Sequence, residues 1–163
     1  MVECIFISPS DIEVFGKINI KKIDADMFPL GIAYIASYIR EKGHTVKLFS
    51  IRELGENWEN ELKKIIIQEN PRIVGIPCVT PTVTDVYKIS SFIKKINNNI
   101  KVVVGGPHPS ALPEETISYT DIDIVGIGEG EITFLEILEK SNLSEIKGIY
   151  YKANRSIKKN YPI

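Results

Sequence analysis

Two adjacent glycines follow a run of three valines in the stretch 102-VVVGGPHPSALPEE-115. The valines predict a buried strand, so Gly105 and Gly106 fall where that strand ends. A tight turn that needs a positive φ angle would be served by a single glycine. Two glycines in a row, followed by Pro107, also allow a flat ligand to lie against bare backbone. We favour this second interpretation.

Small and hydroxyl-bearing residues follow the other predicted strands as well. In an open parallel sheet, ligands bind outside the carboxyl ends of the strands, so these residues mark the expected site. Side chains that act as nucleophiles, acids or bases are scarce among them, and we predict no catalytic residue and no metal ligand. The segments concerned are 8–10, 77–82, 105–108 and 126–131.

The segment 126-GIGEGE-131 has the glycine spacing GxGxG. A dinucleotide-binding fingerprint has the spacing GxGxxG and follows the first strand of its fold, so this segment is a weak indication of that function. Glu129 and Glu131 would also repel a pyrophosphate. The alternative interpretation is structural, because carboxylates are favourable at the start of a helix.

The chain has two histidines and two cysteines. His108, between two prolines, is a ligand, an acid or base, or a plain loop residue, and we favour the last. His44 follows Gly43, where a helix is predicted to end, at the opposite end of the sheet from the site. Cys4 and Cys78 lie in or beside apolar runs and are predicted to be small buried residues. These four residues lack the spacing of a metal site.

Other α/β classes require residues that this chain lacks. A phosphoacceptor receiver domain needs an aspartate after its third strand, where this chain has Pro77 and Cys78. A flavodoxin needs a glycine-bearing phosphate loop after its first strand, and Ser8–Asp11 has none. No GxxxxGK[ST] loop for nucleotide phosphates occurs in the sequence.

Composition and charge exclude several classes of partner. The length of 163 residues and the 44% hydrophobic content are ordinary for one globular domain. A net charge of −1 gives no support for binding to nucleic acid or to a membrane surface. No run approaches the roughly 18 apolar residues of a membrane span, and the first residues lack the pattern of a signal peptide. We therefore expect a cytoplasmic protein.

Short apolar runs alternate with segments of helical periodicity along the chain. Continuously apolar strands alternating with helices predict a parallel sheet covered on both faces. We expect a Rossmann-like, doubly wound α/β domain over residues 1–145, with a mainly parallel five-stranded sheet, followed by an edge strand and linker over residues 146–163. Residues 9–28 form a long connection, which predicts either a function or disorder. Predicted strands are 2–7, 45–49, 73–76, 101–104 and 123–127, with a possible sixth at 149–151, and predicted helices are 30–42, 58–70, 82–96 and 131–138.

Four motifs occur in order along the chain: 28-FPLGIAYIASYI-39, 43-GHTV-46, 105-GGPH-108 and 128-GEGE-131. Together they resemble the N-terminal cobalamin-binding domain of B12-dependent radical SAM enzymes. That group includes anaerobic magnesium-protoporphyrin IX monomethyl ester oxidative cyclases and many methyltransferases. The resemblance covers nearly the whole chain.

The resemblance implies that the chain binds cobalamin. The glycine pair after the fourth strand would lie against the dimethylbenzimidazole tail, and the hydroxyl-bearing stretch after the third strand would line the same cleft. The segments after the first strand and at the start of the first helix would face the corrin, with the histidine and the GEG turn at the rim. The implied cofactor-binding residues are Ser8, Pro9, Leu30, Gly31, Thr80, Pro81, Thr82, Gly105, Gly106, His108, Gly128, Glu129 and Gly130.

One departure from cobalamin domains of the methionine-synthase type concerns the cobalt ligand. Those domains carry an Asp-x-His-x-x-Gly motif after the first strand, whereas 8-SPSDIEVFGKI-18 contains Asp11 and no histidine. The radical SAM group commonly lacks the motif too. The resemblance therefore implies base-off binding, in which no histidine binds cobalt from below.

The CxxxCxxC motif that holds a radical SAM iron–sulfur cluster is missing from this sequence. The resemblance thus implies that S-adenosylmethionine and a 4Fe-4S cluster belong to a radical SAM catalytic domain outside this chain, which would be its partner. The chain would then be a cofactor module and not a complete enzyme. The alternative is the same fold without the cofactor, serving as a substrate- or protein-docking domain.

Overall fold

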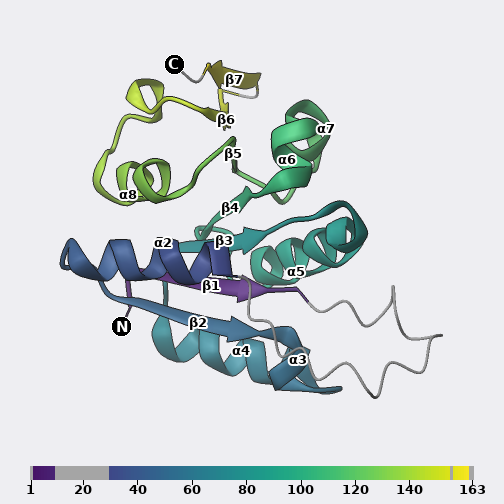
Figure 1. Ribbon diagram of the computed structural model, residues 1–163. Helices are drawn as coiled ribbons and strands as arrows, with labels where there is room; N and C mark the ends of the chain where they lie inside the picture. The colour runs from purple at the N-terminus through teal and green to yellow at the C-terminus, as the bar shows by residue number, and fades with distance from the viewer. Residues whose placement is uncertain (1, 10–29, 155, 162–163) are drawn as a thin grey trace.

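The computed structural model describes residues 2–9, 30–154 and 156–161 (Figure 1). The long connection predicted after the first strand falls almost wholly on residues 10–29, outside the described residues. Seven strands among the described residues form one sheet in the order β2-β1-β3-β4-β5-β6-β7. Their bounds are β1 (Cys4–Ser8), β2 (Val46–Ser50), β3 (Ile73–Pro77), β4 (Lys101–Gly105), β5 (Ile124–Gly126), β6 (Ile149–Ala153) and β7 (Ser156–Asn160).

Helices connect the strands, and all four predicted helices are present. Two further short helices, α6 and α7, follow β4, and a third, α3, follows β2. None of the described helices is long and apolar enough to cross a membrane. The bounds are α2 (Leu30–Glu41), α3 (Ile51–Leu54), α4 (Trp58–Glu69), α5 (Val83–Ile96), α6 (Pro107–Ala111), α7 (Pro113–Ser118) and α8 (Glu131–Glu139), with 3-10 turns η1 (Thr80–Thr82) and η2 (Leu143–Glu145).

The sheet confirms the predicted Rossmann-like, mainly parallel α/β fold. Strands β1 to β5 pair in parallel, whereas β6 is antiparallel to β5 and β7 is antiparallel to β6. The predicted sixth strand is present, but it lies inside the sheet, and β7, which was not predicted, forms the edge. Because β2 and β3 flank β1 on opposite sides, the winding changes direction at β1, and the carboxyl ends nearby are where such folds bind ligands.

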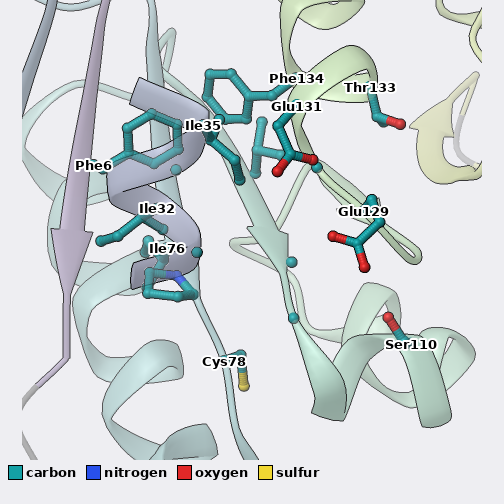
Figure 2. A pocket seen from close by; sticks show the side chains of 18 of the residues that line it. Phe6, Ile32, Ile35, Ile76, Cys78, Ser110, Glu129, Glu131, Thr133 and Phe134 are labelled. Atoms are coloured by element: carbon teal, nitrogen blue, oxygen red, sulfur yellow. The ribbon is translucent and has the colours of Figure 1, made fainter. Parts of the chain in front are cut away.

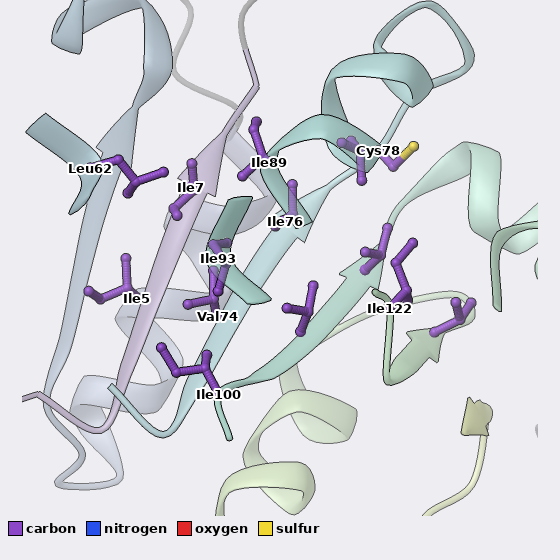
Figure 3. Close-up of a cluster of buried hydrophobic side chains, with 14 of the residues drawn as sticks. Ile5, Ile7, Leu62, Val74, Ile76, Cys78, Ile89, Ile93, Ile100 and Ile122 are labelled. Atoms are coloured by element: carbon purple, nitrogen blue, oxygen red, sulfur yellow. The ribbon is translucent and has the colours of Figure 1, made fainter. Parts of the chain in front are cut away.

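Alternate residues of the strands enter two separate cores, one on each face of the sheet. Ile5 and Ile7 of β1 belong to the core beneath α4 and α5 (Figure 3). Cys4 and Phe6 belong to the core beneath α2 and α8. This period of two is the geometry of a strand buried on both sides, so each helical layer receives one set of side chains. The face under α2 and α8 is called the α2–α8 face below.

The connection from α2 to β2 confirms the predicted helix end at Gly43. The Gly43 N–H donates to the Arg40 carbonyl at 2.9 Å, and the His44 N–H donates to the Ile39 carbonyl at 3.2 Å. Gly43 has φ of 92°, the left-handed conformation that this pattern of helix ending requires. His44 then lies at the amino edge of the sheet, as predicted, where its ring bridges Glu3 and Glu139, each at 3.1 Å.

The His44 bridge makes stability depend on pH. Hydrogen bonds to Glu3 and Glu139 raise the pKa of His44 above its ordinary 6.5. A hydrogen bond from the Thr45 backbone, and then His44, lower the pKa of Glu3 from its ordinary 4.5. The histidine contribution is complete below pH 6.5 and is lost as pH rises through the folded pKa. The glutamate contribution is present above pH 4.5 and is lost as pH falls through its folded pKa.

We therefore expect His44→Gln to lower the free energy of unfolding more at pH 5.5 than at pH 8.5. The difference should be about 0.5 kcal/mol, the usual size for partly exposed ion pairs. Urea unfolding of both proteins at the two pH values measures it, with Glu139→Gln as a second variant that removes one of the two ion pairs. A loss that is the same at both pH values would contradict the bridge.

Candidate functional site

A cavity of about 480 Å³ opens on the α2–α8 face of the sheet, over the carboxyl ends of β3, β4 and β5 (Figure 2). Its walls come from α2 on one side and from α8 and the turn before it on the other. The residues that line it are Phe6, Gly31, Ile32, Ile35, Gly75, Ile76, Pro77, Cys78, Val79, Val103, Gly105, Gly106, Pro107, Ser110, Gly126, Gly128, Glu129, Gly130, Glu131, Thr133, Phe134 and Ile137.

Two glycines at neighbouring strand ends form the floor of the cavity. Val103 of β4 and Ile124 of β5 belong to the core on the α2–α8 face, so Gly105 and Gly126, two residues further on, face the same way. A Cβ atom on Gly126 would meet nothing within 4 Å, and one on Gly105 would meet only the Gly126 carbonyl, at 3.9 Å. We call this pair the glycine floor. It presents bare backbone to whatever enters the cavity.

Gly75 of β3 faces the same way, but its missing side chain is replaced by aromatic rings. A Cβ atom there would overlap the Phe6 ring and would lie 2.9 Å from Phe134. The two rings lie with centroids 4.6 Å apart and planes inclined by 43°. They form the inner end of the cavity, called the phenylalanine wall below (Figure 2).

Gly106 is a glycine for a different reason from its neighbour. Its φ is 116°, and a Cβ atom would lie 2.8 Å from the Cys78 carbonyl oxygen. Any side chain there is strained by backbone conformation and by contact with backbone. The turn interpretation therefore holds at Gly106, where the chain turns into α6, whereas Gly105 leaves the open space that the ligand interpretation needs.

The short helix α6 is hydrogen-bonded to two other segments near the cavity. The Ser110 hydroxyl, in the cavity wall, accepts the Gly128 N–H at 3.1 Å. The His108 N–H donates to the Cys78 carbonyl at 3.2 Å, and the Cys78 N–H donates to the Gly105 carbonyl at 2.8 Å. These bonds fix the ends of β3 and β4 and the turn after β5 relative to one another.

His108 lies in α6 and not in a loop, and it is only 4% exposed. Its Nδ1 is 3.2 Å from the Thr80 hydroxyl. Its Nε2 is buried and has no partner among the residues that the structure describes. The interpretation as a plain loop residue is therefore wrong, because the ring forms part of the buried contact between α6 and η1.

The cavity brings together some of the predicted site residues and leaves others outside. Those that line it are Gly31, Gly105, Gly106, Gly128, Glu129 and Gly130. Those outside its lining are Ser8, Pro9, Leu30, Thr80, Pro81, Thr82 and His108. Ser8 and Thr82 are buried, whereas Leu30 is 72% exposed at the start of α2. Thr82 closes the η1 turn by donating to the Val79 carbonyl at 3.1 Å.

The cysteines confirm the prediction of small buried residues. Cys4 and Cys78 are 0% and 1% exposed, and both are free thiols. Burial raises the pKa of the Cys78 thiol to about 11, so it stays protonated at neutral pH. Within the described residues, no group of three or more His, Cys, Asp or Glu residues could hold a metal ion.

Several lining residues were missed in the sequence. Phe6 and Gly75 could have been found by applying strand alternation to β1 and β3, which places both on one face. Phe134, Ser110 and Thr133 carried no such signal. Ser110 lies outside every predicted helix and strand, and its place in the cavity depends on α6, a helix too short to leave a periodic pattern.

Comparison with known proteins identifies the domain. The family model described as the B12 binding domain matches residues 16–138. The chain belongs to this family. It is 41% identical over 140 residues to an uncharacterized methyltransferase of Pyrococcus horikoshii, a match that covers 82% of this chain and 30% of the relative. It is 27% identical over 111 residues to the anaerobic magnesium-protoporphyrin IX monomethyl ester cyclase of Rubrivivax gelatinosus, covering 68% of this chain and 20% of that protein.

The fold also matches a solved structure of a larger enzyme. This is the radical S-adenosylmethionine methyltransferase TsrM from Kitasatospora setae, solved with cobalamin and a 4Fe-4S cluster bound. The TM-score is 0.80 at 18% identity, and the match covers 99% of this chain and 29% of TsrM. The predicted resemblance is confirmed: this is a B12-binding domain similar to those of B12-dependent radical SAM methyltransferases. The chain spans less than a third of the length of each of these three proteins.

The same substitution should have different effects on stability at the two adjacent glycines. We expect Gly106→Ala to lower the free energy of unfolding by about 1–3 kcal/mol, because of its positive φ and its contact with Cys78. Gly105→Ala should leave stability unchanged or raise it by up to about 1 kcal/mol, because the site is open and alanine has less freedom to lose. Urea unfolding of both variants measures this. Equal losses would contradict the different roles assigned to the pair.

Proposed function

We propose that this chain is the cobalamin-binding module of a B12-dependent radical SAM methyltransferase or cyclase. The cavity would take the dimethylbenzimidazole tail, and the corrin would lie outside the carboxyl ends of the strands. The observation that carries the proposal is the glycine floor, two adjacent strand ends without side chains beneath an open cavity, in a chain of the B12-binding domain family.

The shape and chemistry of the cavity fit the proposed tail. A planar aromatic base needs a flat surface and apolar walls, and the floor of Gly105 and Gly126 is bare backbone. Ile32 and Ile35 of α2 form one wall, and the phenylalanine wall closes the inner end (Figure 2). Aromatic side chains also interact favourably with a ring at their faces or edges. The residues proposed to hold the tail are therefore those of the floor and of these two walls.

The positions of both histidines support base-off binding without a histidine ligand. The sequence has only two, and neither lines the cavity. His44 is engaged with Glu3 and Glu139 at the amino edge of the sheet, and the His108 ring is buried against Thr80. Cys78 does line the cavity, but its protonated thiol is a poor metal ligand.

The proposed partner is a radical SAM catalytic domain, which would hold S-adenosylmethionine and a 4Fe-4S cluster. Support comes from length, because this chain corresponds to 30% of the Pyrococcus relative. Bound cobalamin supplies a cobalt centre that can carry a methyl group. The residues of this chain bind and orient the cofactor and exclude water from its tail.

Binding is tested by titrating the purified chain with hydroxocobalamin and recording the retained absorption spectrum after gel filtration. We expect a retained spectrum of the base-off type. Gly105→Leu and Gly126→Leu should each weaken binding at least tenfold, because the side chain occupies the floor, while far-ultraviolet circular dichroism stays unchanged. Gln68→Leu, on the exposed side of α4, is the matched control. Full-strength binding by both floor variants would exclude the cavity as the tail site, and no binding by the wild-type chain would favour the docking alternative.

The absence of a histidine ligand has its own test. His108→Ala should leave the absorption maxima of the bound cofactor unchanged, because the ring is buried away from the cavity. His108→Asn serves as a second variant that keeps a polar group able to reach Thr80, in case the alanine protein is unstable. A strong spectral shift in both variants would mean that His108 binds cobalt after all.

A further inference from the structure

The polar groups of the cavity are gathered on one side. Figure 2 shows Phe6, Ile32 and Ile35 on the side of α2. On the side of α8 and the turn before it lie four oxygen-bearing side chains, and the lining contains no Lys, Arg or His. These four are Ser110, Glu129, Glu131 and Thr133.

Glu129 is exposed and Glu131 is partly buried, and neither carboxylate is required by the structure of the turn itself. Gly130 is the N-cap of α8, and no side chain forms a capping hydrogen bond there. Neither carboxylate has an ion pair or a hydrogen bond with any residue that the structure describes. The helix dipole favours a carboxylate at Glu131, in the first turn, but it does not require Glu129, which precedes the helix.

The two carboxylates also flank the point where the start of α8 lies close to α2. A Cβ atom on Gly130, between them, would lie 2.6 Å from Ile35 of α2. The turn is thereby held against α2, and both glutamates remain in the lining of the cavity. An apolar cavity therefore carries a concentrated set of hydrogen-bond acceptors at one side, with negative charge and no neutralising cation in its lining.

Two kinds of ligand group would interact oppositely with this acidic side of the cavity. A primary carboxamide is neutral and offers two N–H donors, and a hydrogen bond to a carboxylate is stronger than one between neutral groups. A free carboxylate on the ligand offers no donor and is repelled by both glutamates. The corrin of cobalamin carries carboxamide side chains around its edge, and hydrolysis of one amide converts that position into a carboxylate with little change in shape.

We propose that Glu129 and Glu131 are specificity-determining residues that select corrinoids with intact peripheral carboxamides and reject those with free carboxylates. This rests on the proposed function, since it assumes that the cavity receives a corrinoid. The glutamates accept amide N–H groups near the mouth of the cavity, and the tail is held separately by the glycine floor. The Ser110 hydroxyl, which already accepts the Gly128 N–H, keeps its own proton free for an amide carbonyl.

The test compares hydroxocobalamin with its monocarboxylic acid derivatives, each with one peripheral amide hydrolysed. Isothermal titration calorimetry at pH 7.5 and low salt gives the affinity of each for the wild-type chain. We expect at least one monocarboxylate to bind about tenfold more weakly than hydroxocobalamin. Raising the ionic strength should reduce the ratio of the two affinities, because salt screens the repulsion between the glutamates and the ligand carboxylate.

The variants Glu129→Gln and Glu131→Gln keep the shape and remove the charge. Together they should reduce the discrimination to less than about threefold, because a glutamine accepts an amide without repelling a carboxylate. Glu59→Gln, an exposed residue of α4 on the other face of the sheet, is the matched control and should keep the full ratio.

Three results would contradict the proposed selection. Binding of all derivatives with equal affinity, or discrimination that survives in the double variant, overturns the selection by Glu129 and Glu131 and leaves the proposed function standing. No binding of hydroxocobalamin by the wild-type chain overturns both.

Discussion

The cavity depends on glycines, which have no side chains, on one face of a parallel sheet. A sheet of this class is covered on both faces, and on the α4–α5 side the cover is continuous. On the α2–α8 face, Gly105 and Gly126 leave two adjacent strand ends without side chains, and Gly75 lies two residues before the end of the neighbouring strand β3. The two phenylalanine rings fill the space over Gly75, but no side chain fills the space over Gly105 and Gly126. What remains open is the cavity.

The short helix α6 holds the mouth of that cavity in shape. It begins directly after Gly106, where the chain turns. On its buried side, His108 contacts Thr80. On its cavity side, Ser110 accepts a hydrogen bond from the turn after β5. Two segments far apart in the sequence, residues 78–80 and the turn after β5, are therefore held by hydrogen bonds to this five-residue helix. A rim built this way is preorganised, so less conformational entropy is lost when a ligand binds.

The fold was predictable because its signals are local and repeated. Strands such as Val102–Val104 are continuously apolar, and Gly43 ended its helix in the way that the sequence indicated. β7 was missed because Ser156–Asn160 has one apolar side chain and is a strand only through pairing with β6. In the site, Gly105 and Gly106 were found by type and place. The exclusion of Thr80 and His108 from the cavity was not predictable, because it depends on which way α6 and η1 face.

The phenylalanine wall gives the cavity a defined depth. Its rings come from β1 and α8, elements that also form the core on that face, and they occupy the space above Gly75. The length of the slot is therefore set by core residues, whereas its polarity is set by Ser110 of α6 and by residues of α8 and of the turn before it. Because the two sets line different parts of the cavity, exchanging one ring would change the size of the group that the cavity admits and leave its polar side unchanged.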